Sequence, residues 1–218
     1  MSRYACFCSL DKLPIKSVSI NPGETQLTVS VAFQAGSSST VRNIPENKKV
    51  IQTPFDFDTH GKKIILYQGS VNVGRGLDLM IDTMHLLEDY ILVIIGDGDI
   101  STKLIEKVNT LDLKNCVKFL GRINPDELKN LTPNTTVGMS LEEDLGLNYR
   151  FALPNKIFDY IQAEVPVLVS DLPEMKKIVS DYKVGEVVFN RTPKTLAQQI
   201  EKILKKNCEL NKPDDYWH

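Results

Sequence analysis

The chain has 218 residues, 42% hydrophobic and 25% charged, which is ordinary for a globular protein of one domain, or of one domain and a fragment. Its formal net charge of −2 at pH 7 gives no electrostatic reason to expect a nucleic-acid partner. No apolar run is long enough to cross a bilayer, and residues 1–10 lack the pattern of a secretory signal peptide.

The cysteine pattern bears on metal sites and on the cellular compartment. Cys6, Cys8, Cys116 and Cys208 follow no spacing typical of a zinc or redox site. Reduced thiols are the simplest interpretation, so we expect a cytoplasmic protein. Composition leaves open a peripheral contact with the inner face of a membrane.

Residues 1–45 differ from the rest of the chain. They contain short apolar alternations, a turn signal and a linker rich in serine, but no pattern that suggests chemistry. We therefore expect an N-terminal extension over 1–45, a nucleotide-binding domain over 46–207 and a C-terminal tail over 208–218.

From Lys62 onward, strand-like and helix-like segments alternate. The strands are mostly continuous apolar runs, which is typical of a parallel sheet buried on both faces. Single helices between them favour right-handed βαβ units. We predict an α/β fold, a Rossmann-like parallel sheet of about six strands with helices on both faces. The expected strands cover 63–68, 90–95, 117–120, 135–141, 167–169 and 186–189, and the expected helices begin near 77, 100, 124, 153, 173 and 192. Asn124 and Thr192 are expected to cap the helices that they precede. Residues at helical spacing are expected to face the core: Leu77, Met80, Ile81, Met84 and Leu87 in the first helix, Ile100, Leu104, Ile105, Val108 and Leu111 in the second, and Ile157, Phe158 and Ile161 in the fourth.

Residues 153–171 (LPNKIFDYIQAEVPVLVSD) are predicted to form a helix that runs directly into a buried strand. Pro154 suits a first helical position, because its missing N–H would be unpaired there. Asn155 and Lys156 then lie at the positive end of the helix dipole, where a phosphate binds favourably. Asp159, about one turn further, could bind a sugar hydroxyl. The pattern is typical of a nucleotide site, although an ordinary solvated helix would also fit.

A glycine-rich loop at 69–76 (GSVNVGRG) follows the first expected strand and opens the first helix. Backbone amides in such a loop can approach a phosphate. A P-loop would need lysine and then serine or threonine where Arg75 and Gly76 stand, so a P-loop NTPase is a poor match. A plain strand–helix turn remains the alternative to a phosphate-binding loop.

The second expected strand ends in a loop with two glycines and two aspartates. As a dinucleotide-binding loop it is incomplete, because Ser101 stands where the third glycine or alanine belongs. Asp97 and Asp99 have the spacing of a metal-binding DxD pair, which is an equally weak pattern. The three histidines are scattered and suggest no catalytic base.

Motifs between Gly69 and Asp171 resemble, in order and spacing, the group 1 glycosyltransferases of the GT-B fold. The last of them is similar to "PNK.fEY..aG.Pvv.sd", and the loop at 69–76 to "G.l...KG.d.li". The resemblance covers about residues 42–190. It implies the C-terminal, donor-binding half of a polysaccharide-building enzyme. Such an enzyme moves a sugar from a nucleotide diphosphate sugar to an acceptor hydroxyl with retention.

The resemblance also implies roles for donor-binding residues. Arg75 matches the lysine that neutralises the diphosphate, and Gly69 the first glycine of its loop. Ser70 stands where the family has an arginine, which halves the expected positive charge. Lys156 and Asn155 would assist at the helix N-terminus. Asp159, where the family usually has glutamate, would bind the ribose.

Two further loops resemble family motifs near the donor. Gly96 and Gly98 match a structural turn, "iiGdGp", and the family then needs no metal, because helix dipoles and basic side chains offset the phosphate charge. Phe119 begins a segment similar to "v.flG.v", in which the backbone at Arg122 and Ile123 would contact the nucleotide base.

The expected catalytic residue is Glu143, which resembles the glutamate of "E.fGl" beside the transferred sugar. The family's two acids are eight residues apart, and here Phe151 stands eight residues before Asp159. Glu143 would therefore act across an enlarged loop. In the alternative, the first acid is absent and Asn148 or Tyr149 substitutes for it.

The implied partners are a nucleotide-sugar donor and a saccharide or lipid-linked saccharide acceptor, without a metal or other cofactor. Residues 1–45 are too few for the second domain of a GT-B enzyme and are at most its remnant. We expect the chain to turn over poorly without an N-terminal domain or a separate chain. The alternatives are a non-catalytic nucleotide-binding module and a dinucleotide-dependent oxidoreductase, and preference for UDP or GDP over NAD would exclude the latter.

Overall fold

The computed structural model describes residues 52–210, so the extension expected at 1–45 lies outside the described residues. The six expected strands are present and form one parallel sheet of order β3-β2-β1-β4-β5-β6. The strands are β1 (Lys63–Gln68), β2 (Tyr90–Ile95), β3 (Val117–Gly121), β4 (Val137–Ser140), β5 (Val167–Ser170) and β6 (Gly185–Val188).

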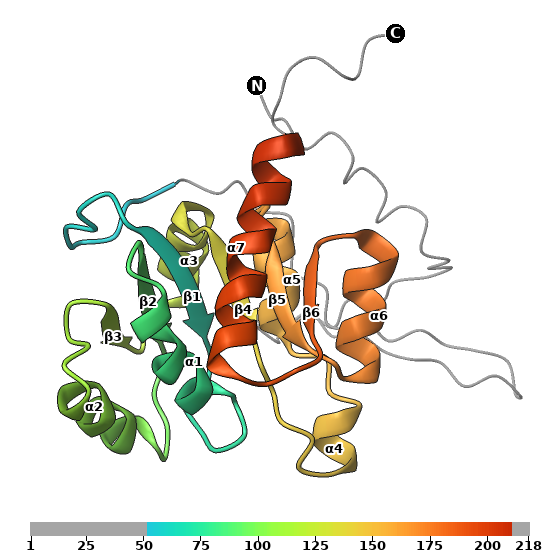
Figure 1. Cartoon of the computed structure of the whole chain (residues 1–218), viewed down its shortest axis with the longest axis horizontal. Helices are drawn as coiled ribbons and strands as arrows, with labels where there is room; N and C mark the ends of the chain where they lie inside the picture. Colours follow the sequence, from blue (N-terminus) through green and yellow to red (C-terminus); the bar gives the residue numbers. More distant parts are fainter. Residues whose placement is uncertain (1–51, 211–218) are drawn as a thin grey trace, which may run out of the picture. The chain divides into compact units, whose positions relative to one another are not determined.

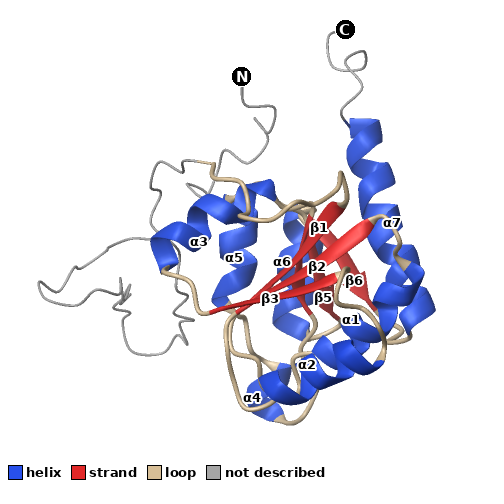
Figure 2. Cartoon of the chain, turned by 90° about the vertical axis from the view of Figure 1, so that its left-hand side faces the viewer, coloured by secondary structure: helices blue, strands red, loops and turns tan. Residues whose placement is uncertain are grey.

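Helices cover both faces of the sheet. Helices α1, α2 and α7 pack on one face and α3, α5 and α6 on the other, so the two helical layers enclose the strands (Figures 1 and 2). This arrangement confirms the predicted Rossmann-like fold. The helices are α1 (Leu77–Thr83), α2 (Ser101–Thr110), α3 (Pro125–Leu131), α4 (Leu147–Arg150), α5 (Asn155–Gln162), α6 (Pro173–Tyr182) and α7 (Pro193–Leu210), with 3₁₀ turns η2 (Met84–Leu86) and η3 (Thr132–Asn134).

Successive side chains of the strands alternate between two separate hydrophobic cores, one on each face of the sheet. On β1, Ile65 and Tyr67 pack with α1 and α7, whereas Ile64 and Leu66 pack with α5 and α6. Successive side chains of a strand point to opposite faces, so a strand covered on both faces needs apolar residues throughout. All four of these residues are at most 5% exposed. The continuous apolar runs in the sequence are explained in this way.

The predicted helix faces are correct in part. The apolar residues expected to face the core between 77 and 87 are all buried. Ile105 of α2 is an exception at 42% exposure, because Leu104 and Val108 form the stripe that faces the sheet. On α5, Phe158 is only partly buried and Tyr160 takes a buried position, since Gly138 leaves space on β4 for its ring.

Helix starts follow the expected capping chemistry at two of three positions. The Asn124 side chain accepts a hydrogen bond from Asp126 N at 3.0 Å, with Pro125 as first residue of α3. Thr192 Oγ1 accepts one from Thr195 N at 3.3 Å at the start of α7. Pro154 precedes α5 as its N-cap and is not its first residue. Within residues 52–210, no helix is both long and apolar enough to span a bilayer.

The order in which the chain adds strands to the sheet reverses between β1 and β4. From β1 the chain proceeds through β2 to β3 on one side, and from β4 through β5 to β6 on the other. Strands β1 and β4 pair only through Ile65 with Val137 and Leu66 with Gly138. In sheets of this order, ligands bind outside the carboxyl ends of the strands at this reversal. The loops that follow β1 and β4 therefore frame the candidate site.

Candidate functional site

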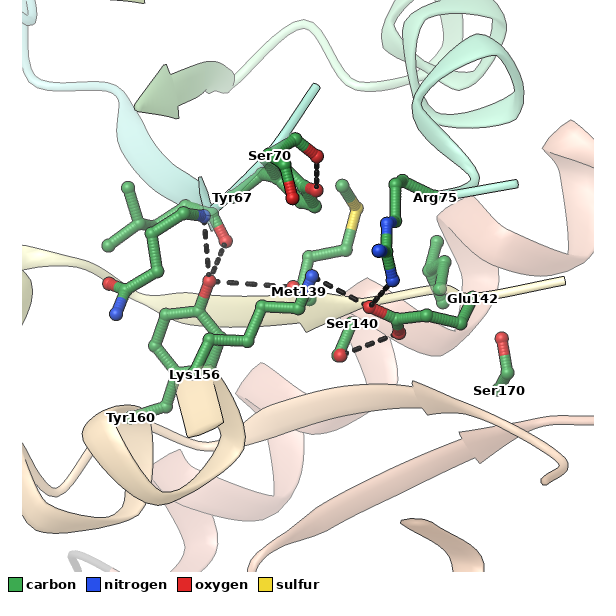
Figure 3. A network of polar contacts seen from close by, with 12 residues as sticks. Tyr67, Ser70, Arg75, Met139, Ser140, Glu142, Lys156, Tyr160 and Ser170 are labelled. Carbon is green, nitrogen blue, oxygen red and sulfur yellow. Dashed lines mark hydrogen bonds and ion pairs between the residues drawn. The ribbon is translucent and has the colours of Figure 1, made fainter. Parts of the chain in front are cut away.

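A buried carboxylate and two cations meet at the carboxyl end of β4 (Figure 3). Glu142 Oε1 lies 2.7 Å from Lys156 Nζ and 3.7 Å from Arg75 Nη1. Glu142 Oε2 accepts a hydrogen bond from Ser140 Oγ at 2.7 Å. The Glu142 side chain is fully buried. A buried carboxylate is costly unless it is paired, so these contacts are needed to hold it.

The two cations come from different elements. Lys156 lies in the first turn of α5 and is buried, with Nζ 4.2 Å from the ring centroid of Tyr67. Burial lowers the pKa of Lys156, and the neighbouring Glu142 carboxylate opposes this effect. Arg75 ends the loop after β1, is partly exposed, and stacks over the ring of Tyr149 at 5.7 Å. Both cations predicted to bind the diphosphate thus meet at one point.

Asp159 lies one turn beyond Lys156 on α5, as the sequence spacing requires. Its Oδ2 accepts a hydrogen bond from Gln68 Nε2 at 2.8 Å, which places it beside the carboxyl end of β1. Burial raises the pKa of Asp159, and the hydrogen bond from Gln68 opposes the shift.

Glu143 lies in the loop after β4 and is partly exposed. Its backbone N–H donates to Gly74 O at 2.8 Å, so this loop touches the glycine loop after β1. Its carboxylate lies 3.8 Å from Arg191 Nη2. The same guanidinium donates to Leu141 O at 3.1 Å and Ser170 Oγ at 2.8 Å, which connects the loop after β6 to the loop after β4 and to the end of β5.

The predicted glycines serve mainly to bring loops together. A Cβ on Gly96, whose φ is 132°, would overlap the carbonyl oxygen of Gly69. A Cβ on Gly98 would overlap the carbonyl oxygen of Val71. A Cβ on Gly69 itself would lie 4.0 Å from Lys156 Nζ. The first residues of the loop after β1, from Gly69 to Val71, therefore pack closely against the loop after β2.

The remaining predicted residues lie at the edge of this group. Ser70 is exposed, and its carbonyl accepts a hydrogen bond from the Tyr67 hydroxyl at 2.6 Å. Asn155 is exposed at the start of α5. The Arg122 side chain is 82% exposed and lies 3.9 Å from Asp97 Oδ2, while Ile123 packs against the core. Arg122 and Ile123 follow β3, two strands away from β1.

Three residues of this site were not predicted from the sequence. They are Gln68, Glu142 and Arg191, each within three residues of a strand's carboxyl end. That position is a usable signal, because the carboxyl ends of parallel strands meet at one edge of the sheet. For Glu142, the spacing of two from Ser140 also places both side chains on the same side of the chain.

Other candidate sites among the described residues are weaker. Residues 52–210 contain no group of three or more His, Cys, Asp or Glu side chains that could hold a metal ion. A pocket of about 430 Å³ lies at the amino end of β1, lined in part by Phe55, Phe57, Lys63 and Thr136. It is at the opposite end of β1 from Arg75 and lacks acidic and basic groups in contact with each other.

Residues 52–216 match the family described as glycosyl transferases group 1. The chain belongs to this family. The match and the fold agree on the C-terminal domain of the GT-B glycosyltransferases, as the sequence motifs predicted. The sheet reversal thus lies within a domain of this family.

Relatives of this glycosyltransferase are distant and longer. An uncharacterized glycosyltransferase of Methanocaldococcus jannaschii is 27% identical over an alignment of 204 residues, and the match covers 82% of this chain and 50% of that protein. Chitobiosyldiphosphodolichol beta-mannosyltransferase of Candida albicans is 25% identical over an alignment of 149 residues, and the match covers 64% of this chain and 32% of that protein. The chain spans half the length, or less, of these curated relatives.

A variant of S. aureus TarM, solved in complex with fondaparinux, alpha-GlcNAc-glycerol and UDP, has the same fold as this domain. The TM-score is 0.59 with 16% identity, and the match covers 82% of this chain and 34% of that one. At this identity the likeness supports the fold alone.

Proposed function

We propose that the chain is the donor-binding half of a retaining glycosyltransferase. It moves a sugar from a nucleotide diphosphate sugar to an acceptor hydroxyl in polysaccharide or glycoconjugate synthesis. The observation that carries this proposal is the convergence of Arg75 and Lys156, from two separate elements, on one point at the sheet reversal, with Asp159 one turn away. This arrangement supports a site in which the two cations bind a diphosphate and the carboxylate binds a ribose.

The chemistry follows from where charge develops. As the sugar leaves, negative charge grows on the diphosphate, and donors already in place stabilise it. Arg75, Lys156 and the helix N-terminus at Asn155 would supply these donors without a metal. Asp159 would hold the ribose hydroxyls, and the partly exposed Glu143 would orient the transferred sugar.

The acceptor requires more protein than this domain. Since the chain spans half the length or less of its relatives, we infer that a saccharide or lipid-linked saccharide acceptor binds with the help of a second domain or a separate chain. The isolated chain would then bind donor but transfer sugar slowly. We place the reaction in the cytoplasm, at the inner membrane face if the acceptor is a lipid-linked saccharide.

Calorimetric titration of the chain with UDP, GDP, ADP, UDP-sugars and NAD, with EDTA and then with Mg²⁺, tests donor binding. We expect one diphosphate to bind without metal and to bind more weakly to Arg75→Ala and Asp159→Ala. Lys176→Ala is the matched control, because Lys176 pairs with Asp171 at an exposed position away from the cations. Binding of NAD alone would contradict the proposal and favour an oxidoreductase.

Transfer is tested separately, by supplying an N-terminal domain from a relative and following the anomeric configuration of the product by NMR. A product with the configuration of the donor supports retention. Donor binding without any transfer, even with that domain present, would instead identify a non-catalytic nucleotide-binding module.

A further inference from the structure

Glu142 has no part in the proposed function, yet it contacts both cations of the site. We propose that Glu142 is a positioning residue, whose buried carboxylate keeps Lys156 in its ammonium form and directs it, with Arg75, at the donor diphosphate. The identity of the ligand rests on the proposed function, whereas the pairing of the two buried charges does not.

The carboxylate is oriented from both sides. Ser140 donates to Oε2 at 2.7 Å, which turns Oε1 towards Lys156 Nζ at 2.7 Å and Arg75 Nη1 at 3.7 Å. Ser140 and Glu142 are both at most 1% exposed. The carboxylate is therefore held by the end of β4 itself, and its position does not depend on a flexible surface side chain.

The surroundings of Lys156 would otherwise favour its neutral form. The ammonium is buried beside the Tyr67 ring, and the nearby Arg75 guanidinium repels it. Within residues 52–205, Glu142 is the acidic residue at ion-pair distance from Lys156. Asp159, on the same helix, accepts from Gln68 instead. Burial lowers the pKa of the lysine and the contacts with Glu142 raise it, so the charge on Lys156 depends on this partner.

Glu143 is not equivalent to Glu142, although the two are adjacent. Glu143 is 42% exposed on its side chain and lies near Arg191, whereas the Glu142 side chain is fully buried. Two cations and one carboxylate leave a positive excess at the site. A dianionic diphosphate can thus be attracted, while the buried Lys156 ammonium keeps a partner in the empty protein.

The protonation of Lys156 can be measured directly, with or without a nucleotide. We would follow the ¹³Cε resonances of labelled lysine through a pH titration of the full chain, assigning Lys156 by its loss in Lys156→Met. In the wild-type chain, Lys156 should be an ammonium at neutral pH. In Glu142→Gln, which keeps shape and volume, its titration should move to lower pH.

Asp171→Asn is the matched control, because it removes one carboxylate near the end of β5 that pairs with Lys176. It should leave the Lys156 titration unchanged. A wild-type Lys156 that is neutral at neutral pH would overturn the inference, and so would an unchanged titration in Glu142→Gln. If Glu142→Gln does not fold, the wild-type measurement still decides.

Donor affinity gives a second readout. A nucleotide sugar is the suitable ligand, because its diphosphate has no terminal phosphate that titrates near neutral pH. In Glu142→Gln we expect affinity to fall about tenfold or more as the pH rises and Lys156 loses its proton, and in wild type to change by less than about twofold over the same pH series. In Lys156→Met, adding Glu142→Gln should create no such pH dependence.

The two proposals can fail separately. A wild-type chain that binds no nucleotide sugar would contradict the proposed function, while the lysine titration would still support or overturn the role of Glu142. Nucleotide-sugar binding in Glu142→Gln with the wild-type pH profile would overturn the role of Glu142 and leave the proposed function standing.

Discussion

The hydroxyl of Tyr160 takes the place of a strand partner for Gln68. It accepts a hydrogen bond from Gln68 N at 3.1 Å and donates to Leu66 O at 3.1 Å, just where β1 and β4 stop pairing. Its ring lies against Gly138, where a Cβ would overlap it. A side chain from α5 therefore provides the hydrogen bonds of β1 where its pairing with β4 ends.

Removing this hydroxyl should destabilise the fold. In Tyr160→Phe the buried Gln68 N–H loses its acceptor, which should lower the free energy of unfolding by about 1–3 kcal/mol. Urea denaturation followed by circular dichroism measures the change. Tyr182→Phe is the control, because Tyr182 is 46% exposed, and it should change the free energy by less than about 0.5 kcal/mol. Equal effects of the two substitutions would show that the buried hydroxyl has no special role.

Gly96 should not tolerate a side chain. In Gly96→Ala the new methyl group meets the Gly69 carbonyl and the backbone has a φ of 132°, so we expect a loss of about 3 kcal/mol or more. Gly61→Ala separates the two causes. Gly61 has a φ of 75° but nothing within 4 Å of a Cβ, so it should cost only about 1–2 kcal/mol. A similar loss in both variants would mean that the contact between the loops contributes nothing.

The shape of the Arg75 side chain should matter as well as its charge. Arg75→Ala should weaken nucleotide-sugar binding by about tenfold or more, the loss of a charged hydrogen bond. Arg75→Lys keeps the charge but loses the forked donors and the stacking on Tyr149, so we expect an intermediate affinity. Calorimetry measures both. Wild-type affinity in Arg75→Ala would exclude this residue from the diphosphate site.

The buried carboxylate of Asp159 should lower the stability of the folded chain at neutral pH, although it serves donor binding. Burial raises the pKa of its carboxyl in the folded chain, so the folded state binds its proton more tightly than the unfolded state does. Stability is then lost as the pH rises from the unfolded value, about 3.9, through the folded pKa.

Asp159→Asn should therefore be more stable than the wild type at neutral pH, and this advantage should disappear in acid. It should also bind a nucleotide sugar about tenfold more weakly. Thermal melts over a pH series and calorimetry test the two parts. Asp171→Asn, at an exposed position, should show neither effect. An Asp159→Asn variant that is less stable at neutral pH would show that its bond with Gln68 outweighs the cost of burial.

The fold could be predicted from the sequence because both sides of the sheet are covered. Such strands are apolar at every position, so β1 and β2 were assigned to the residue. Burial on the helices was harder to predict. Two features depend on packing partners that lie far apart in the sequence. One is which neighbour of Leu104 faces the sheet, and the other is the position of the Tyr160 ring in the space at Gly138.

Part of the site was predictable for the same reason. Arg75 lies in the loop that follows β1, and Lys156 lies in the first turn of α5. Both positions are at the carboxyl edge of the sheet, where parallel strands bring loops together. Glu142 was missed because motif matching selects its neighbour Glu143. Sequence does not show which of two adjacent acids is buried, since that is decided by where Ser140, Arg75 and Lys156 lie in space.

The attachment of α5 through Tyr160 leads us to expect that a bound donor will protect the two halves of the site unequally. Lys156 and Asp159 share a helix that is pinned into the sheet, whereas Arg75 comes from a loop that exposes Val73 and touches the loop around α4. Local opening is easiest where few apolar contacts are buried. In hydrogen–deuterium exchange, a bound donor should therefore slow the amides of 69–76 and 141–150 far more than those of α5.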